Sequence, residues 1–154
     1  MAGMVEPVIR PVRANDAAAW HTLWRGYCDF YRATVPEAAT AATWARVLEP
    51  DAKVRCIVAE RDGRVCGLAN HVLHENTWGV QPVCYLEDLF VQPSARGKGV
   101  GKALVEALRR SMATEGWSRL YWNTREDNAP ARRLYDRFTR ADGCVRYVLT
   151  PNPS

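Results

Sequence analysis

A glycine-rich turn between an apolar strand and an amphipathic helix constrains this chain more than any other segment. It reads Arg96-Gly97-Lys98-Gly99-Val100-Gly101-Lys102. Glycines at alternate positions allow unusual backbone dihedrals and a close approach to a ligand. The start of the following helix presents unpaired N–H groups and a partial positive charge, to which the three cations add full charges. The segment is therefore predicted to hold a phosphate group.

The spacing of the turn excludes two common phosphate motifs. A P-loop needs G-x-x-x-x-G-K-[ST], but Gly97 and Gly101 are one residue too close, and Ala103 stands where the magnesium-binding hydroxyl belongs. The dinucleotide pattern G-x-G-x-x-G fails because Lys102 takes its last glycine position. A plain tight turn into a helix is the alternative that needs no ligand.

Apolar periodicity and turn signals predict elements in the order β-α-α-β-β-β-α-β-α-β. The predicted strands are Val8–Arg13, Lys53–Arg61, Arg64–His74, Pro82–Val91, Arg119–Thr124 and Cys144–Leu149. The predicted helices run from Asn15 or Asp16 to before Pro36, over Thr40–Glu49, from Val100 to Gly116, and from Asp127 or Asn128 to about Arg140. Short turns such as Asp62-Gly63 favour antiparallel pairing, and the later strand–helix–strand unit favours one parallel pair. The predicted fold class is mixed α/β with one central sheet.

Composition narrows the setting and the partners. A length of 154 residues fits one domain, and a net charge of +4 with dispersed arginines argues against nucleic-acid binding. No run is long and apolar enough to cross a membrane, and no secretory signal is apparent. The cysteines number five and include no CxxC pair, which argues against a zinc site and a full set of disulfides. A reducing, cytoplasmic setting is expected.

Three segments, in order, resemble the GNAT superfamily of N-acetyltransferases. The turn meets that family's acetyl-CoA pattern [QR]-x-x-G-x-[GA]. Tyr85–Val91, which reads YLEDLFV, resembles the preceding strand in the diamine acetyltransferase and Hpa2-like branches, and Asn128–Tyr135 resembles a later N-x-x-A-x-x-L-Y helix. After Tyr135 the chain reads Asp-Arg-Phe-Thr-Arg where many members carry Gly-Phe. The resemblance implies one domain over residues 1–154, with a mostly antiparallel sheet, one parallel and splayed strand pair, and helices on both faces.

The resemblance also implies an acetyl-CoA site without metal. The strand end would pair with the pantetheine amides, the turn would hold the pyrophosphate, and the later helix would contact the cofactor further along. The implied residues are Leu89, Phe90, Val91, Arg96, Gly97, Lys98, Gly99, Val100, Gly101, Lys102, Asn128, Ala131 and Tyr135. Arg132 and Arg133 either reach the adenosine phosphate or are solvated helix cations.

The expected reaction is attack of an amine on a thioester. An alkyl ammonium has a pKa of about 10.4, so a base must remove its proton near pH 7. The resemblance points to Glu87 as this base, with Asp88 as a structural residue or an ammonium anchor, and to Tyr135 as the proton donor to the CoA thiolate. The alternatives are a sheet carboxylate paired to an arginine for Glu87, and a core tyrosine for Tyr135.

The acceptor side is the least determined part of the sequence. Aromatic residues on the first helix, among them Trp24, Tyr27 and Tyr31, either belong to the core or wall an acceptor groove beside Glu87 and Asp88. The expected function is acetyl transfer by direct attack in a ternary complex to a small primary amine, either a polyamine or an amino-acid-like amine. The alternatives are a protein lysine or N-terminal acetyltransferase, an acyl-CoA sensor without turnover, and a nucleotide-binding module. A homodimer is expected from the family.

Overall fold

The computed structural model describes residues 5–152, which divide into two compact units with the boundary in the chain between Asn123 and Thr124. The first unit holds a five-stranded sheet and three α helices. Its strands are β1 (Val8–Pro11), β2 (Val54–Arg61), β3 (Arg64–His74), β4 (Val83–Val91) and β5 (Arg119–Tyr121). Its helices are α1 (Ala17–Phe30), α2 (Glu37–Val47) and α3 (Val100–Glu115), with short 3₁₀ turns η1 (Ala14–Asp16) and η2 (Pro93–Ala95). The second unit holds α4 (Ala129–Tyr135).

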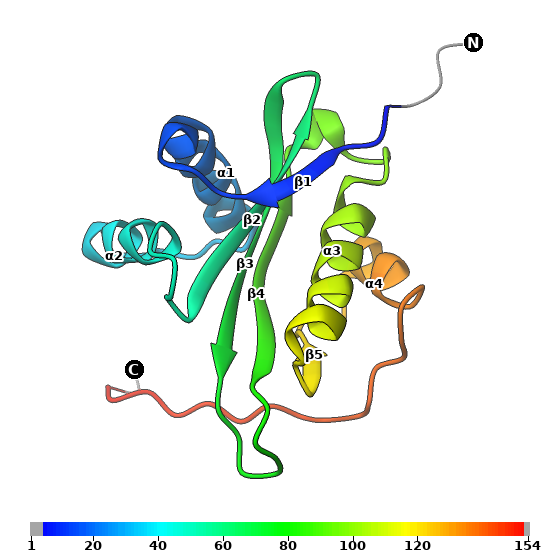
Figure 1. Ribbon diagram of the computed structural model, residues 1–154. Helices are drawn as coiled ribbons and strands as arrows, with labels where there is room; N and C mark the ends of the chain where they lie inside the picture. The colour runs from blue at the N-terminus through cyan, green and yellow to red at the C-terminus, as the bar shows by residue number, and fades with distance from the viewer. Residues whose placement is uncertain (1–4, 153–154) are drawn as a thin grey trace. The chain divides into compact units, whose positions relative to one another are not determined.

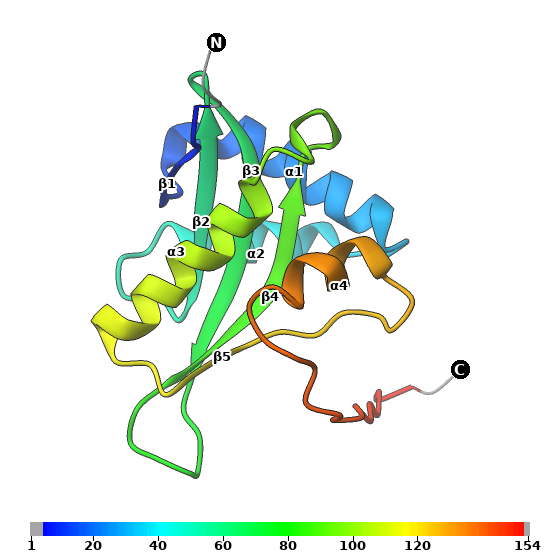
Figure 2. The same ribbon diagram turned by 90° about the vertical axis from the view of Figure 1, so that its right-hand side faces the viewer.

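The sheet has the order β1-β2-β3-β4-β5. The first three pairs are antiparallel, and β4 and β5 are parallel, which confirms the mixed α/β class. The parallel pairing ends where Tyr85 meets Tyr121, while β4 continues to Val91 (Figure 2). The two strands therefore separate, and the edge of β4 from Leu86 onward has no strand beside it in the first unit.

Helices cover both faces of the sheet, as expected: α1 and α2 lie on one face and α3 on the other (Figure 1). Trp20 of α1 is fully buried in a core with Leu68 of β3 and Phe90 of β4. On the other face, Gly67 lets α3 approach closely, because a Cβ atom there would lie 3.1 Å from a methyl carbon of Val100. Close packing on both sides leaves β3 and β4 largely buried.

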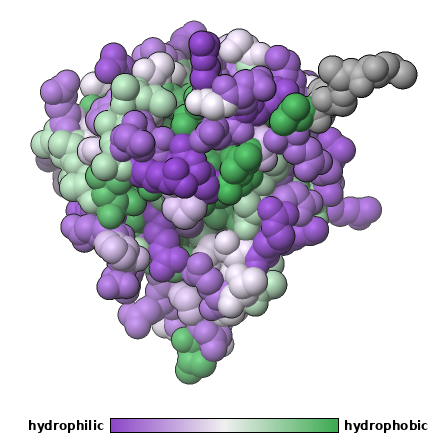
Figure 3. Space-filling view, turned by 45° about the horizontal axis from the view of Figure 1, so that its top comes forward, coloured by the Kyte–Doolittle hydropathy of each residue, from purple (hydrophilic) through white to green (hydrophobic). Residues whose placement is uncertain are grey.

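The surface mixes polar and apolar side chains. On the face shown in Figure 3, hydrophobic residues lie in separate patches among hydrophilic ones. Among residues 5–152, none of the helices combines the length and the apolar character that a membrane span needs.

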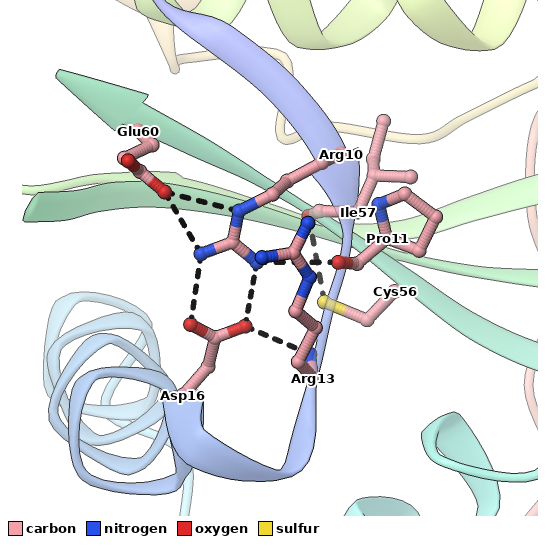
Figure 4. Close-up of polar contacts among 7 residues, drawn as sticks. All are labelled: Arg10, Pro11, Arg13, Asp16, Cys56, Ile57 and Glu60. Carbon is pink, nitrogen blue, oxygen red and sulfur yellow. Dashed lines mark hydrogen bonds and ion pairs between the residues drawn. The ribbon is translucent and has the colours of Figure 1, made fainter. Parts of the chain in front are cut away.

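An ion-pair cluster ties the start of α1 to the edge of the sheet (Figure 4). The guanidinium group of Arg10 in β1 contacts Asp16 through two nitrogens, at 2.8 and 3.0 Å, and Glu60 of β2 at 2.9 Å. The backbone N–H of Arg13 also donates to the Asp16 carboxylate at 2.7 Å. Asp16 directly precedes α1, so this cluster links the first residue before that helix to β1 and β2.

Several predicted element bounds were close, and a few were wrong. The Asp62-Gly63 hairpin is confirmed, with positive φ angles at both residues. Helix α2 begins at Glu37 rather than Thr40, because the carbonyl of Pro36 already accepts from the N–H groups of Ala39 and Thr40. The last strand of the first unit ends at Tyr121 rather than Thr124, where the chain leaves β4.

The predicted strand Cys144–Leu149 is wrong: these residues form no regular secondary structure. The apolar side chains that suggested a strand, Val145, Tyr147, Val148 and Leu149, are exposed. A strand needs a paired neighbour as well as a suitable sequence, so β propensity alone does not produce one here. The preceding helix also stops early, at Tyr135 instead of about Arg140, and passes into tight turns at Phe138 and Thr139.

Candidate active site

The glycine-rich turn has the geometry expected of an anion site. Gly97 and Gly99 have φ angles of +75° and +80°, a left-handed conformation that favours glycine. Gly99 caps α3, and its carbonyl accepts the first helical hydrogen bond, from Ala103, at 3.0 Å. A Cβ atom at Gly97 or Gly99 would meet no atom within 4 Å, so the space over the turn is open. The N–H groups of the first turn of α3 have no helical partner and point out of the helix start.

The cations of the turn contact the protein itself. Arg96 donates from Nε to the carbonyl of Val91 at 3.0 Å, and its guanidinium lies 5.9 Å from the ring centre of Phe30 and 5.3 Å from that of Phe90. Lys98 donates from Nζ to the carbonyl of Ser94 at 3.2 Å. Lys102 is exposed on the first turn of α3. Arg96 and Lys98 therefore brace the turn, and their role as phosphate ligands stays a prediction.

The end of β4 offers a backbone edge. On one side Leu89, Phe90 and Val91 pair with Ala69, Leu68 and Gly67 of β3. On the other side β5 has already ended, so their outward N–H and C=O groups are available to an extended chain of amides. This is the arrangement that a pantetheine arm would use.

A β-bulge separates the two adjacent carboxylates of β4. Asp88 pairs with Asn70 and Leu86 pairs with His71, so Glu87 is the extra residue. Glu87 is exposed, whereas Asp88 is only 8% exposed. The bulge thus gives two neighbouring carboxylates very different environments.

Asp88 is a buried carboxylate without a cation. Asn70 donates from Nδ2 to Asp88 Oδ2 at 3.2 Å, and the hydroxyl of Tyr27 in α1 faces the same group. Burial raises the pKa of Asp88 to about 6; hydrogen bonding from Asn70 and Tyr27 lowers it, and the charge of Glu87 raises it. Within residues 5–152, no Lys, Arg or His forms an ion pair with Asp88. A buried, charged Asp88 would therefore be stabilised by a positively charged partner.

Aromatic rings stack along α1 toward this carboxylate. The ring centres of Trp20 and Trp24 are 5.9 Å apart, those of Trp24 and Tyr27 are 5.4 Å apart, and those of Tyr27 and Tyr31 are 4.7 Å apart. Trp20 belongs to the core, whereas Trp24, Tyr27 and Tyr31 are half-buried. The aromatic series therefore begins in the core at Trp20 and continues to half-buried side chains that solvent can reach. Burial and the nearby charge of Asp88 raise the pKa of Tyr27, so its hydroxyl stays protonated.

Three further residues, one each from β3, β4 and β5, lie close together and were not predicted as site residues. Tyr85 and Tyr121 stack with ring centres 4.9 Å apart, and Nε2 of His74 lies 2.9 Å from the hydroxyl oxygen of Tyr121. Asn70 was missed as well. A polar residue in the middle of the apolar run of β3 was the available signal for it.

The second unit carries the remaining predicted residues. Asn128 caps α4, as predicted, by accepting a hydrogen bond from the N–H of Ala131 at 3.4 Å, and its Nδ2 donates to Thr124 at 3.2 Å. Tyr135 is the last residue of α4, two turns after Asn128. Their contacts with a cofactor stay predictions.

Two other features of the described residues bear on the site. No group of three or more His, Cys, Asp or Glu side chains in residues 5–152 is arranged to hold a metal ion. A separate open hollow of about 780 Å³ lies beside α1. Its lining includes Ala18, Thr22, Gly26, Phe30, Phe90 and Arg96, but neither Asp88 nor the glycines of the turn.

Comparison with known proteins matches these features to one family. Residues 20–139 match the acetyltransferase (GNAT) family. The chain is 32% identical to the D-amino-acid N-acetyltransferase HPA3 of Saccharomyces cerevisiae, over 91% of this chain and 88% of that protein. It is 30% identical to an aminoglycoside N(6')-acetyltransferase type 1 of Stenotrophomonas maltophilia, over 96% of each.

Solved structures share the fold. An aminoglycoside N-acetyltransferase in complex with CoA superposes with a TM-score of 0.81 over 99% of both chains, at 22% identity. The chain therefore belongs to the GNAT family and is an acetyl-CoA-dependent N-acetyltransferase.

Proposed function

We propose that this enzyme acetylates a small primary amine, which presents its ammonium group to Asp88 between the aromatic side chains of α1. The observation that carries the proposal is the buried Asp88 carboxylate without a cation, next to Tyr27. An alkyl ammonium satisfies the carboxylate, and the faces of aromatic rings favour a cation. Relatives named for D-amino acids and aminoglycosides support an amino-acid-like or polyamine-like acceptor.

The reaction needs a group that removes a proton from the acceptor. Acetyl-CoA supplies a thioester whose carbonyl carbon the neutral amine attacks, with formation of the N–C bond and cleavage of the C–S bond. Asp88 takes the proton that the ammonium loses, and its pKa of about 6 keeps it largely ionised at neutral pH. Tyr135 of α4 gives a proton to the departing thiolate, and the second proton, which the nitrogen loses as the amide forms, restores the tyrosine hydroxyl.

Asp88 is our choice for the base, and Glu87 is the alternative. A buried base is shielded from water and its pKa lies near the working pH, which favours proton transfer. Glu87, the bulge residue, is exposed. On this proposal its contribution is its negative charge, which raises the pKa of Asp88. The resemblance to the family favours Glu87 as the base, and a comparison of variants of the two carboxylates decides between them.

The cofactor site follows the same proposal. The outward edge of Leu89–Val91 binds the pantetheine amides, and the N–H groups from Gly97 to Lys102 bind the pyrophosphate. Asn128 and Ala131 remain predicted cofactor contacts. Cytoplasmic location and a homodimer remain predictions, to be checked by fractionation and by light scattering.

A panel of amines with detection of released CoA thiol tests the function. We expect turnover with D- or L-amino acids, polyamines or aminosugars, and none without an amine. Acetyl-CoA binding without release across the panel would instead support a sensor. Release with peptides alone would support a protein acceptor, and competition by ATP with a need for magnesium would support a nucleotide-binding module.

A pair of variants then identifies the base. Asp88→Asn and Glu87→Gln each remove one carboxylate and keep its shape. We expect Asp88→Asn to lower kcat/KM by about 10²- to 10⁴-fold at pH 7, with partial recovery at high pH, and Glu87→Gln to lower it by much less. The reverse order of effects would assign the base to Glu87.

A further inference from the structure

We propose that Asn70, held by Trp20, is a positioning residue that orients the Asp88 carboxylate and favours its ionised form. The inference rests on the proposed role of Asp88 as base. The three residues come from different elements: Trp20 from α1, Asn70 from β3 and Asp88 from β4. All three are buried, with exposures of 0%, 2% and 8%.

The two hydrogen bonds among these side chains have the same direction, with Trp20 donating to Asn70 and Asn70 donating to Asp88. Nε1 of Trp20 donates to Oδ1 of Asn70 at 3.4 Å, and Nδ2 of Asn70 donates to Oδ2 of Asp88 at 3.2 Å. An indole N–H can only donate, so the amide oxygen of Asn70 must face Trp20. The amide nitrogen must then face Asp88. An ionised Asp88 can only accept, so Trp20 and Asp88 together select one of the two orientations of this amide.

This arrangement has two consequences for Asp88. The bond from Asn70 occupies one carboxylate oxygen and leaves lone pairs of the other to Tyr27 and to an acceptor. It also stabilises the charged form, because a hydrogen bond to a carboxylate is strengthened by the charge. With a neutral donor, this gain comes without a cation that would compete with the acceptor ammonium.

No other described group can take over this role. Facing Asp88 are Tyr27 and Cys28 from α1, Cys56 from β2 and Glu87 from its own strand. Burial raises the pKa of both thiols, so they stay neutral, and the negative charge of Glu87 disfavours an ionised Asp88. Loss of Asn70 would therefore leave only Tyr27 to stabilise the charge.

The test measures the ionisation of Asp88 in two independent ways. In Asn70→Leu the side chain keeps its size and loses the donor. We expect the pKa of Asp88, followed by carbon NMR of its carboxyl group, to rise by about one pH unit or more. The acid limb of the pH profile of kcat/KM should move up by the same amount, and a shift of one unit means about a fivefold loss at pH 6 and little loss at pH 9.

Two more variants serve as graded comparison and control. Trp20→Phe keeps an aromatic ring and removes the indole donor, so the amide of Asn70 loses one of the two groups that orient it, and we expect a smaller shift in the same direction. His71→Leu changes the next residue of β3, also buried, which packs against Trp117 on the other face of the sheet. It should leave both the NMR titration and the acid limb unchanged.

The outcomes separate this inference from the proposed function. An unchanged titration of Asp88 in both folded variants, Asn70→Leu and Trp20→Phe, would overturn the positioning role. A shifted NMR titration with an unmoved acid limb would support the positioning role and reject Asp88 as the base. A shift of equal size in His71→Leu would show a general effect of destabilisation and would overturn the inference.

Discussion

Gly26 in α1 lies directly against the ring of Phe90 in β4: a Cβ atom at Gly26 would be 2.7 Å from Cε1 of that ring. Phe90 is buried, and a Cβ atom at Gly26 would force its ring to shift from that packed position. This contact brings α1 close to β4, the strand that carries Asp88. Gly26 directly precedes Tyr27, whose hydroxyl faces Asp88.

Gly26→Ala should therefore destabilise the protein although alanine favours helices. The gain in helix propensity is about 1 kcal/mol, whereas overpacking of a core costs about 1–3 kcal/mol. We expect a net loss of about 1 kcal/mol in the free energy of unfolding, measured with urea. A double change with Phe90→Leu should recover part of that loss. A more stable Gly26→Ala protein would show that α1 can move away from β4 without cost.

The Arg10 cluster should govern stability at neutral pH. Arg10→Met leaves the buried Asp16 without its partner, and we expect a loss of about 3 kcal/mol at pH 7. Arg55→Met is the matched control, because Arg55 and Glu115 form a more exposed ion pair at 2.9 Å. That change should cost about 1 kcal/mol or less. Equal losses in the two variants would mean that the Arg10 cluster is no stronger than a surface pair.

The same cluster should shape acid unfolding. The hydrogen bonds from Arg10 hold the pKa of Asp16 below its ordinary value of 3.8. A depressed carboxyl pKa contributes stability above about pH 4, and that stability is lost as the pH falls through the folded pKa. Stability should thus fall less steeply on acidification in Arg10→Met than in the unmodified protein, as measured by urea unfolding between pH 5 and pH 2.

Asp88→Asn should stabilise the protein while it abolishes most activity. Asp88 has a pKa of about 6 in the folded protein against an ordinary value of 3.8. Below the lower value it is protonated in both states, and above pH 6 its buried charge costs about 3 kcal/mol. The variant should gain up to about that amount at pH 7.5 and little at pH 4. A gain of the same size at both pH values would contradict burial of the charge as the cause.

The turn before α3 can be tested with a control for backbone strain. Gly99 and Gly63 have φ angles of +80° and +73°, and a Cβ atom at either would meet nothing within 4 Å. Gly99→Val and Gly63→Val therefore carry similar strain, on the order of 1–3 kcal/mol. Only Gly99→Val should weaken acetyl-CoA binding, by at least tenfold in calorimetric titration. Unchanged affinity in a folded Gly99→Val protein would reject this turn as the pyrophosphate site.

Tyr135→Phe tests the proposed proton donor. A CoA thiol has a pKa near 8.5, so its thiolate leaves fairly well unaided. We expect kcat to fall by about 10- to 1,000-fold with little change in acetyl-CoA affinity. A large loss of affinity with kcat intact would make Tyr135 a binding residue instead.

The local features of this protein follow from its sequence. The Asp62-Gly63 hairpin, the helix that begins after Gly99 and the cap at Asn128 all lie where residue patterns predict them. Each depends on residues only a few positions apart, whose backbone preferences act before any distant contact forms. The glycine-rich turn and the YLEDLFV strand also point to the family, because each is a short pattern of neighbouring residues.

Tertiary structure alone decided which of the two carboxylates is buried. Alternation along a regular strand would place Glu87 and Asp88 on opposite faces, but the bulge breaks that alternation, and the structure leaves Glu87 exposed and Asp88 buried beside Tyr27 of α1. The two hydrogen bonds of the Trp20–Asn70–Asp88 series join residues 50 and 18 positions apart in the sequence. Pairing also decided that Cys144–Leu149, a plausible strand by composition, forms none. Burial, strand pairing and the ionisation of a buried group depend on partners that are distant in the chain, and no pattern within a short segment encodes them.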